Sequence, residues 1–186
     1  MRAMQLCKVG GLVLYSTCSI NPIEDEAVIT ELFRKCNSDA FELIDIQEII
    51  PNLKSRRGMT KWSILDKKEG FKPEKPKEGE PKPTYKPDEI FTIFNKWEEV
   101  PKDYKGGLIR ETMFPDDEEK MKNVYKIQNT LRILPHDQNT GGFYLALIRK
   151  KSHIVFGGGE KKPKASSPKK EKPMTDENEE KKSEPQ

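Results

Sequence analysis

The feature that most constrains the fold is a stretch near the amino terminus, residues 10–28, that combines a glycine turn, an apolar run, a cysteine and a helix start. The run Leu12–Tyr15 is continuously apolar, which is typical of a strand buried on both faces of a sheet. Cys18 follows after two small polar residues. Because open α/β sheets carry their chemistry at the carboxyl ends of such strands, Cys18 is expected to face a crevice.

A helix is predicted to begin directly after Cys18. Asn21 suits the N-cap, Pro22 suits the first helical position, and Glu24 completes a capping box. An apolar stripe then continues at roughly helical spacing through Ala27, Val28, Leu32 and Cys36. The positive end of a helix favours a nearby thiolate, so we interpret Cys18 as a nucleophile. The competing interpretation makes it a small buried hydrophobic residue, as we expect for Cys7 and Cys36.

Two more strands are predicted, over residues 41–46 and 142–148, and a short helix over 116–127. The chain then divides into four parts: a strand-helix-strand part over 1–65, a Pro/Lys/Glu-rich insertion over 66–90, a remainder over 91–156, and a disordered charged tail over 157–186. These elements are too few to cover both faces of a sheet. They predict the carboxyl-terminal half of an α/β domain.

Charge is distributed unevenly along the chain, although the net charge is only +3. Residues 54–86 carry 11 Lys and Arg against 5 acids, and residues 149–172 carry 9 against 2. Such stretches suggest contact with a polyanion, and the alternative is that they are solvated linkers. Three cysteines and two histidines without a CxxC motif predict no metal site. The sequence contains no apolar run of membrane length, so we expect a soluble intracellular protein.

Two groups of residues resemble motifs of the RsmB/Nop/Sun family of RNA cytosine-5 methyltransferases. Residues 15–19 followed by 21–26 resemble its Thr-Cys motif, and residues 132–136 followed by 140–144 resemble its closing motif and last strand. Residues 110–115 and the long insertion resemble the eukaryotic tRNA-type (Sun-domain) subgroup. The resemblance covers roughly residues 1–150.

The resemblance implies a Rossmann-like class I methyltransferase domain, of which this chain would hold the last three strands, with the final strand antiparallel. It implies methylation of tRNA cytosine with S-adenosylmethionine as cofactor. Cys18 matches the family's nucleophile, which adds to C6 of the target cytosine. The target base must leave its stack to reach the thiol.

Other family motifs have no counterpart in this sequence. The second cysteine of the family, in an Asp-x-Pro-Cys motif, and the glycine-rich and acidic cofactor motifs are missing. We therefore predict that the chain is a fragment without cofactor-binding residues and is inactive alone. One alternative is a truncated, non-catalytic RNA-binding or interaction module, and another is an unrelated Rossmann-like protein in which Cys18 is merely buried.

Five further residues are candidates for RNA binding. His136 precedes the last strand and could face the base or a phosphate, whereas Arg56, Arg57 and Lys61 beside Trp62 could grip a phosphate and stack a base. The alternative is that they serve packing and solvation. We expect a monomer with RNA as its partner, located in the nucleus or nucleolus and also in the cytoplasm.

Overall fold

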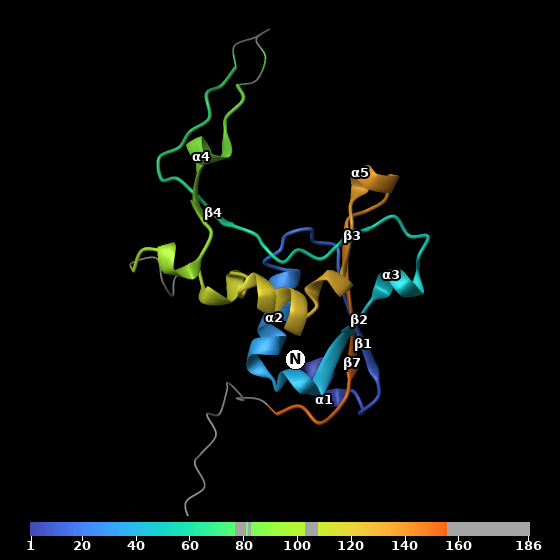
Figure 1. Cartoon of the computed structure of the whole chain (residues 1–186). Helices are drawn as coiled ribbons and strands as arrows, with labels where there is room; N and C mark the ends of the chain where they lie inside the picture. The colour runs from blue at the N-terminus through green and yellow to red at the C-terminus, as the bar shows by residue number, and fades with distance from the viewer. Residues whose placement is uncertain (77–80, 82, 103–107, 156–186) are drawn as a thin grey trace, which may run out of the picture.

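The computed structural model describes residues 1–76, 81, 83–102 and 108–155 of the 186-residue chain (Figure 1). Its strands are β1 (Leu12–Thr17), β2 (Phe41–Ile44), β3 (Arg56–Arg57), β4 (Ile64–Lys67), β5 (Phe91–Phe94), β6 (Leu131–Ile133) and β7 (Phe143–Lys150). Its α-helices are α1 (Arg2–Leu6), α2 (Glu26–Lys35), α3 (Ile46–Ile49), α4 (Pro87–Ile90) and α5 (Pro135–Gln138). Shorter helical turns are η1 (Ser38–Ala40), η2 (Trp97–Glu99), η3 (Glu111–Met113), η5 (Ile127–Asn129) and the π-helical η4 (Lys120–Val124).

Strand β7 forms the centre of the main sheet. β1 pairs antiparallel with one edge of β7, from Leu12 opposite Arg149 to Thr17 opposite Tyr144. On the other edge, β2 pairs with the carboxyl half of β7 and β6 pairs with its amino half, and β3 extends the sheet beyond β6. These pairs are all antiparallel, so the prediction that the last strand runs opposite to its neighbours is confirmed.

Helix α2 covers the sheet and supplies much of the core. Ile29, Leu32 and Phe33 of this helix are buried. The ring of Phe33 lies 4.5 Å from that of Phe41 on β2 and 4.4 Å from that of Tyr125, measured between centroids. Such aromatic pairs add to the free energy gained from apolar burial. The core therefore joins the helix to the sheet and to the segment that precedes β6.

The start of α2 differs from the prediction. The helix begins at Glu26, because the backbone of Asp25 leaves the helical region at φ −110° and ψ −98°. Asn21 caps only a turn that precedes the helix, in which its Oδ1 accepts from the Ile23 amide at 3.1 Å. Glu24 does not close a capping box, since the Asn21 amide donates to Ser19 Oγ at 3.0 Å. The positive end of α2 thus lies further along the chain from Cys18 than predicted.

The prediction that β1 is buried on both faces is wrong. Leu12 is 54 % exposed and Leu14 is 59 % exposed, whereas Val13 and Tyr15 are half-buried. The described residues pair with β1 only along its β7 edge. An apolar strand with an unpaired edge and exposed leucines is unusual on the surface of a globular domain.

Helix α1 is held to the sheet by a buried lysine. Lys150, at the end of β7, is 4 % exposed, and its Nζ donates to the carbonyls of Met4 at 2.8 Å and Cys7 at 2.7 Å. These carbonyls belong to the last turn of α1 and the residue after it, where a positive charge is favoured by the helix dipole. Gly10, with φ +81°, then turns the chain into β1.

The region of the insertion forms an arm that extends away from the main sheet (Figure 1). Its base is a hairpin of β4 and β5, with Ile64 opposite Phe94, which the sequence did not predict. Residues 77–80 and 82 of the insertion, and the whole predicted tail over 157–186, lie outside the described residues. The short helix predicted over 116–127 is confirmed only in part, because the helical residues are 118–124, and Lys120–Val124 among them form the π-helical η4. Across the described ranges, the helices are too short or too polar to span a membrane.

Candidate active site around Cys18

Cys18 directly follows β1 and carries a free, exposed thiol. The preceding residue, Thr17, lies opposite Tyr144 on β7, so Cys18 emerges at the end of the sheet where β7 begins. This agrees with its predicted place at the carboxyl end of a strand. The competing prediction, that Cys18 is a buried hydrophobic residue, is wrong because the side chain is exposed, while Cys36 is buried as expected.

The segment after Cys18 forms a series of tight turns that use their own side chains as acceptors. The Ser19 amide donates to Thr17 Oγ1 at 3.1 Å. In the same way, the Asn21 amide donates to Ser19 Oγ and the Ile23 amide to Asn21 Oδ1. At the far end, the Tyr15 hydroxyl donates to the carbonyl of Glu24 at 2.8 Å. Short polar residues favour such local bonds over regular structure. The segment is therefore ordered without being helical.

A buried ionic cluster lies below this segment. Arg132 on β6 donates through Nε to Glu26 Oε1 at 2.6 Å and through Nη2 to the other carboxylate oxygen of Glu26. Its Nη1 donates to the carbonyl of Ile20 at 2.9 Å, and its Nη2 lies 3.2 Å from Asp25 Oδ2. The side chain of Arg132 is only 6 % exposed, and those of both acids are fully buried.

The two acids of the cluster are held differently. Glu26 Oε1 also accepts from the amide of Met59 at 2.8 Å, so this carboxylate is well satisfied. The oxygens of Asp25 have no hydrogen-bond donor among the described residues. Burial raises the pKa of Asp25 from 3.8 to about 7, against the opposing charge of Arg132 and with a further rise from Glu26 and Glu24. Asp25 is thus the strained member of the cluster.

The loop between β6 and β7 closes over the other side of the Cys18 segment. A Cβ on Gly142 would lie 3.0 Å from Ile20 Cγ2, 3.6 Å from the Cys18 carbonyl oxygen and 3.8 Å from Pro135 Cδ. The backbone of Gly142 therefore lies between the Cys18 segment and the start of α5. This close approach brings α5 to the same end of the sheet as Cys18.

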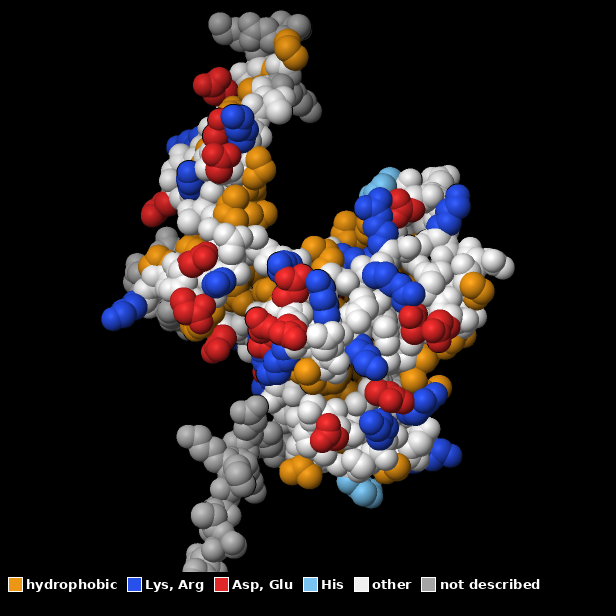
Figure 2. Space-filling view, viewed as in Figure 1, with side chains coloured by type: hydrophobic (Ala, Val, Ile, Leu, Met, Phe, Trp, Pro, Cys, Tyr) orange, Lys and Arg blue, Asp and Glu red, His pale blue; other side chains and the backbone are white. Residues whose placement is uncertain are grey.

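His136 and Arg56 meet at this end of the sheet. Arg56 on β3 makes a bidentate pair with Asp137, at 2.9 Å through Nε and 2.8 Å through Nη2, and Nη2 also lies 3.1 Å from His136 Nε2. The hydrogen bond from Arg56 lowers the pKa of Asp137. Both Arg56 and His136 are exposed, and Figure 2 shows a histidine among basic side chains where α5 lies in Figure 1.

The remaining candidates have other surroundings. Arg57 pairs with Asp45, whose Oδ1 also accepts from the amide of Gln47 at the start of α3. Lys61 pairs with Glu118. Trp62 is 8 % exposed, and its indole nitrogen donates to the carbonyl of Met113 at 2.7 Å. This geometry favours a packing role for Trp62 over base stacking. The described contacts do not join Lys61 and Trp62 to Arg56.

Sequence reasoning missed the Arg132 cluster and the close approach at Gly142. The signal was present, because Arg132 interrupts the apolar run from Leu131 to Leu134. A charged residue inside such a run is seldom buried without a partner. The neighbouring acids at 25 and 26 stand where acidic residues also favour the start of a helix, which conceals their role as that partner.

Comparison with known proteins places this site in a family. The family model for 16S rRNA methyltransferase RsmB/F matches residues 1–72, which include Cys18. A tRNA (cytosine(34)-C(5))-methyltransferase of Drosophila melanogaster is 34 % identical over 155 residues, which are 83 % of this chain and 18 % of that protein. Multisite-specific tRNA:(cytosine-C(5))-methyltransferases of Schizosaccharomyces pombe and Saccharomyces cerevisiae are 34 % and 32 % identical over 83 % and 80 % of this chain, and 19 % and 17 % of their own lengths.

The chain therefore spans less than one fifth of the length of these relatives. The residues matched by the family model contain β1, Cys18 and the two acids of the ionic cluster, whereas Arg132 and β7 lie outside them. By these matches and by the arrangement of its residues, the chain belongs to the RsmB/F family of RNA methyltransferases.

Proposed function

We propose that this chain supplies the cytosine-attacking part of a tRNA cytosine-5 methyltransferase, with Cys18 as its nucleophile. The observation that carries the proposal is an exposed free thiol at the carboxyl end of β1, in the region that matches the family. The relatives named above act on tRNA, which favours tRNA over other RNA as the substrate. A base must be flipped out of its stack to reach this thiol.

The chemistry explains why a thiol is needed. In the aromatic cytosine ring, C5 is a weak nucleophile. When the Cys18 thiolate forms a bond from Sγ to C6, the π electrons of the C5–C6 bond are released toward C5, which can then accept a methyl group. Loss of the C5 proton and departure of the thiolate restore the ring as 5-methylcytosine. This divides one difficult step into two easier ones.

The methyl donor S-adenosylmethionine, which the family uses, does not fit the described residues. Nucleotide-like cofactors bind beyond the carboxyl ends of parallel strands, at a glycine-rich turn and beside an acidic residue. Within the described part of the sheet, the strand paired with β1 is the antiparallel β7, and the glycines at 10 and 11 lie at the amino end of β1. We therefore assign no methyl-donor step to this chain and propose that another part of the enzyme holds the donor.

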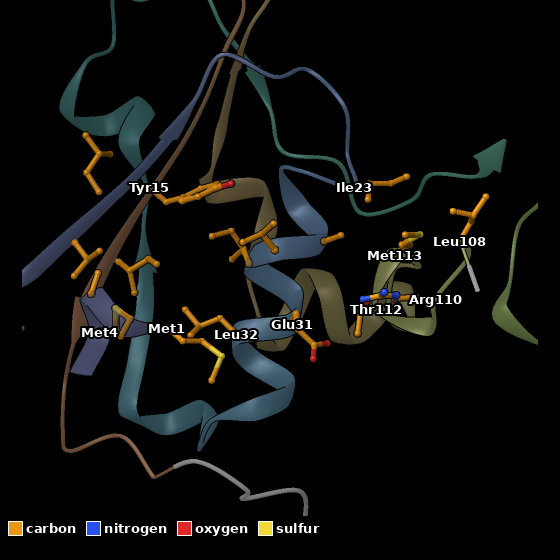
Figure 3. Close-up of a pocket in the computed structure, with 17 residues that line it drawn as sticks. Met1, Met4, Tyr15, Ile23, Glu31, Leu32, Leu108, Arg110, Thr112 and Met113 are labelled. Carbon is orange, nitrogen blue, oxygen red and sulfur yellow. The ribbon is translucent and has the colours of Figure 1, made fainter. Parts of the chain in front are cut away.

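An apolar groove beside β1 supports the idea that another part of the enzyme is needed. The groove has a volume of about 570 Å³ and runs between α1, β1, α2 and residues 108–113. Figure 3 shows Met4, Tyr15 and Leu32 on one side of it and Leu108 and Met113 on the other. Together with the exposed leucines of β1, this surface is what an enzyme would cover with the rest of its sheet and helices. We propose that the remainder of the methyltransferase domain covers it.

For RNA, we propose that His136 and Arg56 lie nearest the target nucleotide. Both side chains are exposed at the end of the sheet that carries Cys18. Because Arg56 is already paired with Asp137, a phosphate would have to replace that carboxylate. Trp62, which is buried, is proposed to serve packing, and the exposed Arg57 and Lys61, each paired with a carboxylate, are proposed to contribute only weakly to RNA binding.

The test is a chimera in which this chain replaces the aligned segment of the Drosophila relative. The chimera is incubated with S-adenosylmethionine and tRNA containing 5-azacytosine, which retains the enzyme as a covalent adduct. We expect an adduct that Cys18→Ala abolishes and that the control Cys7→Ala leaves intact. An adduct that survives Cys18→Ala would refute the assignment of the nucleophile. The isolated chain is expected not to bind S-adenosylmethionine in calorimetry. Measurable binding would refute the proposal that another part of the enzyme holds the methyl donor.

A further inference from the structure

We propose that Arg132 is a positioning residue, which sets the conformation of the Cys18 segment by holding the Ile20 carbonyl. The inference rests on the proposed function only in giving Cys18 its chemical role. The residue lies on β6, more than a hundred positions along the chain from the segment it contacts. It does not touch the reacting atoms itself.

The argument begins with how firmly Arg132 is held. Two of its nitrogens donate to the Glu26 carboxylate, and its Nη2 also lies close to Asp25. The guanidinium carbon lies 5.8 Å from the ring centre of Tyr144, which is a further favourable contact for a cation. A planar guanidinium with a bidentate carboxylate has a fixed orientation. The remaining nitrogen, Nη1, therefore points in a defined direction.

That remaining nitrogen reaches the segment that matters for Cys18. Nη1 donates to the carbonyl of Ile20, two residues after Cys18. The other hydrogen bonds described for residues 18–23 join near neighbours in the sequence. Within the described part of the chain, Arg132 is thus the hydrogen-bond donor that ties this segment to a distant strand. The same arginine would lose that tie if its orientation changed.

Packing on the other side reinforces this restraint. The side chain of Ile20 lies against Gly142, where a Cβ would come within 3.0 Å of it. The segment is therefore held between the loop before β7 and the arginine below. Enzymes need their nucleophile held within a fraction of an ångström of the productive position. Arg132 and Gly142 together provide such a restraint for Cys18.

The experiment compares the buried Arg132 with the half-buried Arg34 in the full chain. Arg132→Met removes the cluster's donor, and Arg34→Met is the matched control. Arg34 also makes a bidentate carboxylate pair, with Asp116, and donates to a backbone carbonyl, that of Phe114, but on the far half of α2. Amide hydrogen exchange of the peptide covering residues 18–24 is the first readout. We expect at least a tenfold faster exchange in Arg132→Met and less than a twofold change in Arg34→Met.

The second readout is the rate of Cys18 alkylation by iodoacetamide as a function of pH, followed by peptide mass spectrometry. Arg132→Met is expected to shift the pH profile of the alkylation rate. Arg132→Lys keeps the charge but not the bidentate geometry, so its profile is expected to lie between those of Arg132→Met and the wild type. In the chimera described above, Arg132→Lys should lower kcat by at least tenfold and leave KM for tRNA unchanged.

Several results would overturn the proposal. One is unchanged exchange and alkylation in Arg132→Met, and another is an equal change in the Arg34→Met control, which would indicate general loosening. If Arg132→Met does not unfold cooperatively and is therefore misfolded, the exchange and alkylation rates of Arg132→Lys are compared with those of the wild type instead. Because exchange and alkylation need no RNA, they fail or succeed independently of the adduct experiment, so a failure of this inference is distinguishable from a failure of the proposed function.

Discussion

Replacing Asp25 by asparagine should make the protein more stable at neutral and alkaline pH. Asp25 is fully buried, and its carboxylate oxygens have no hydrogen-bond donor among the described residues. The substitution therefore keeps the shape of the side chain, breaks no described hydrogen bond and removes a buried charge, and the interaction that it gives up is the ion pair with Arg132 Nη2. Arg132 keeps its bidentate partner Glu26.

The size of the effect follows from the pKa of Asp25. Burial raises this pKa from 3.8 to about 7, so between these values the folded state binds a proton that the unfolded chain has released. Stability is then fully present below about pH 4 and is lost as the pH rises through 7. A rise of this size corresponds to about 4 kcal/mol at 25 °C. The advantage of Asp25→Asn should therefore be close to zero at pH 4 and approach this value at pH 8.

Urea denaturation followed by circular dichroism at pH 4, 5, 6, 7 and 8 provides the measurement. The control is Asp88→Asn, the same change at an exposed aspartate on the arm. The reasoning would be refuted by wild type and Asp25→Asn curves that run parallel across this range. It would equally be refuted by an asparagine variant that loses stability as the pH rises.

Three further predictions concern packing and backbone contacts. Lys150→Met should destabilise the protein by about 2 to 4 kcal/mol, because the carbonyls at the end of α1 lose a buried charged donor; thermal unfolding would show it, and the exposed neighbour Lys151→Met should change little. Gly142→Val should speed amide exchange in the Cys18 segment, because a Cβ there would lie 3.0 Å from Ile20 Cγ2 and the segment would have to shift to make room; unchanged exchange would count against the close approach. Trp62→Phe should cost about 1 to 2 kcal/mol in denaturant unfolding, because a buried carbonyl loses its indole donor, without changing RNA binding; weaker RNA binding would restore the stacking interpretation.

The sequence predicted well those features that local patterns determine. The strand before Cys18, the position of this cysteine directly after the strand, and the last strand were all predicted and all found. The direction of β7 came from the family resemblance. Such features depend on apolar runs and on residues close together in the chain.

The features that were missed depend on contacts between distant residues. β3 pairs with β6, so that Arg56 lies opposite Arg132. These strands have only two and three residues, which is too short for a local pattern to reveal a partner so far along the chain. The start of α2 was placed too early because Asn21 and Pro22 do form a capped turn, while the backbone of Asp25 leaves the helical region before Glu26. The burial of Arg132 likewise requires two acids from another part of the chain.

The central place of β7 has a consequence for how the chain is made. β1 and β2 each find their hydrogen-bonded neighbour in β7, and β6 does as well. During synthesis the first two strands are complete before residue 45, whereas the strand that joins them is finished only at residue 150. The main sheet therefore cannot close while the chain is still emerging through its first 140 residues. While residues 45–142 are being synthesised, β1 and β2 therefore lack their β7 partner, and chaperones and proteases have access to these apolar strands.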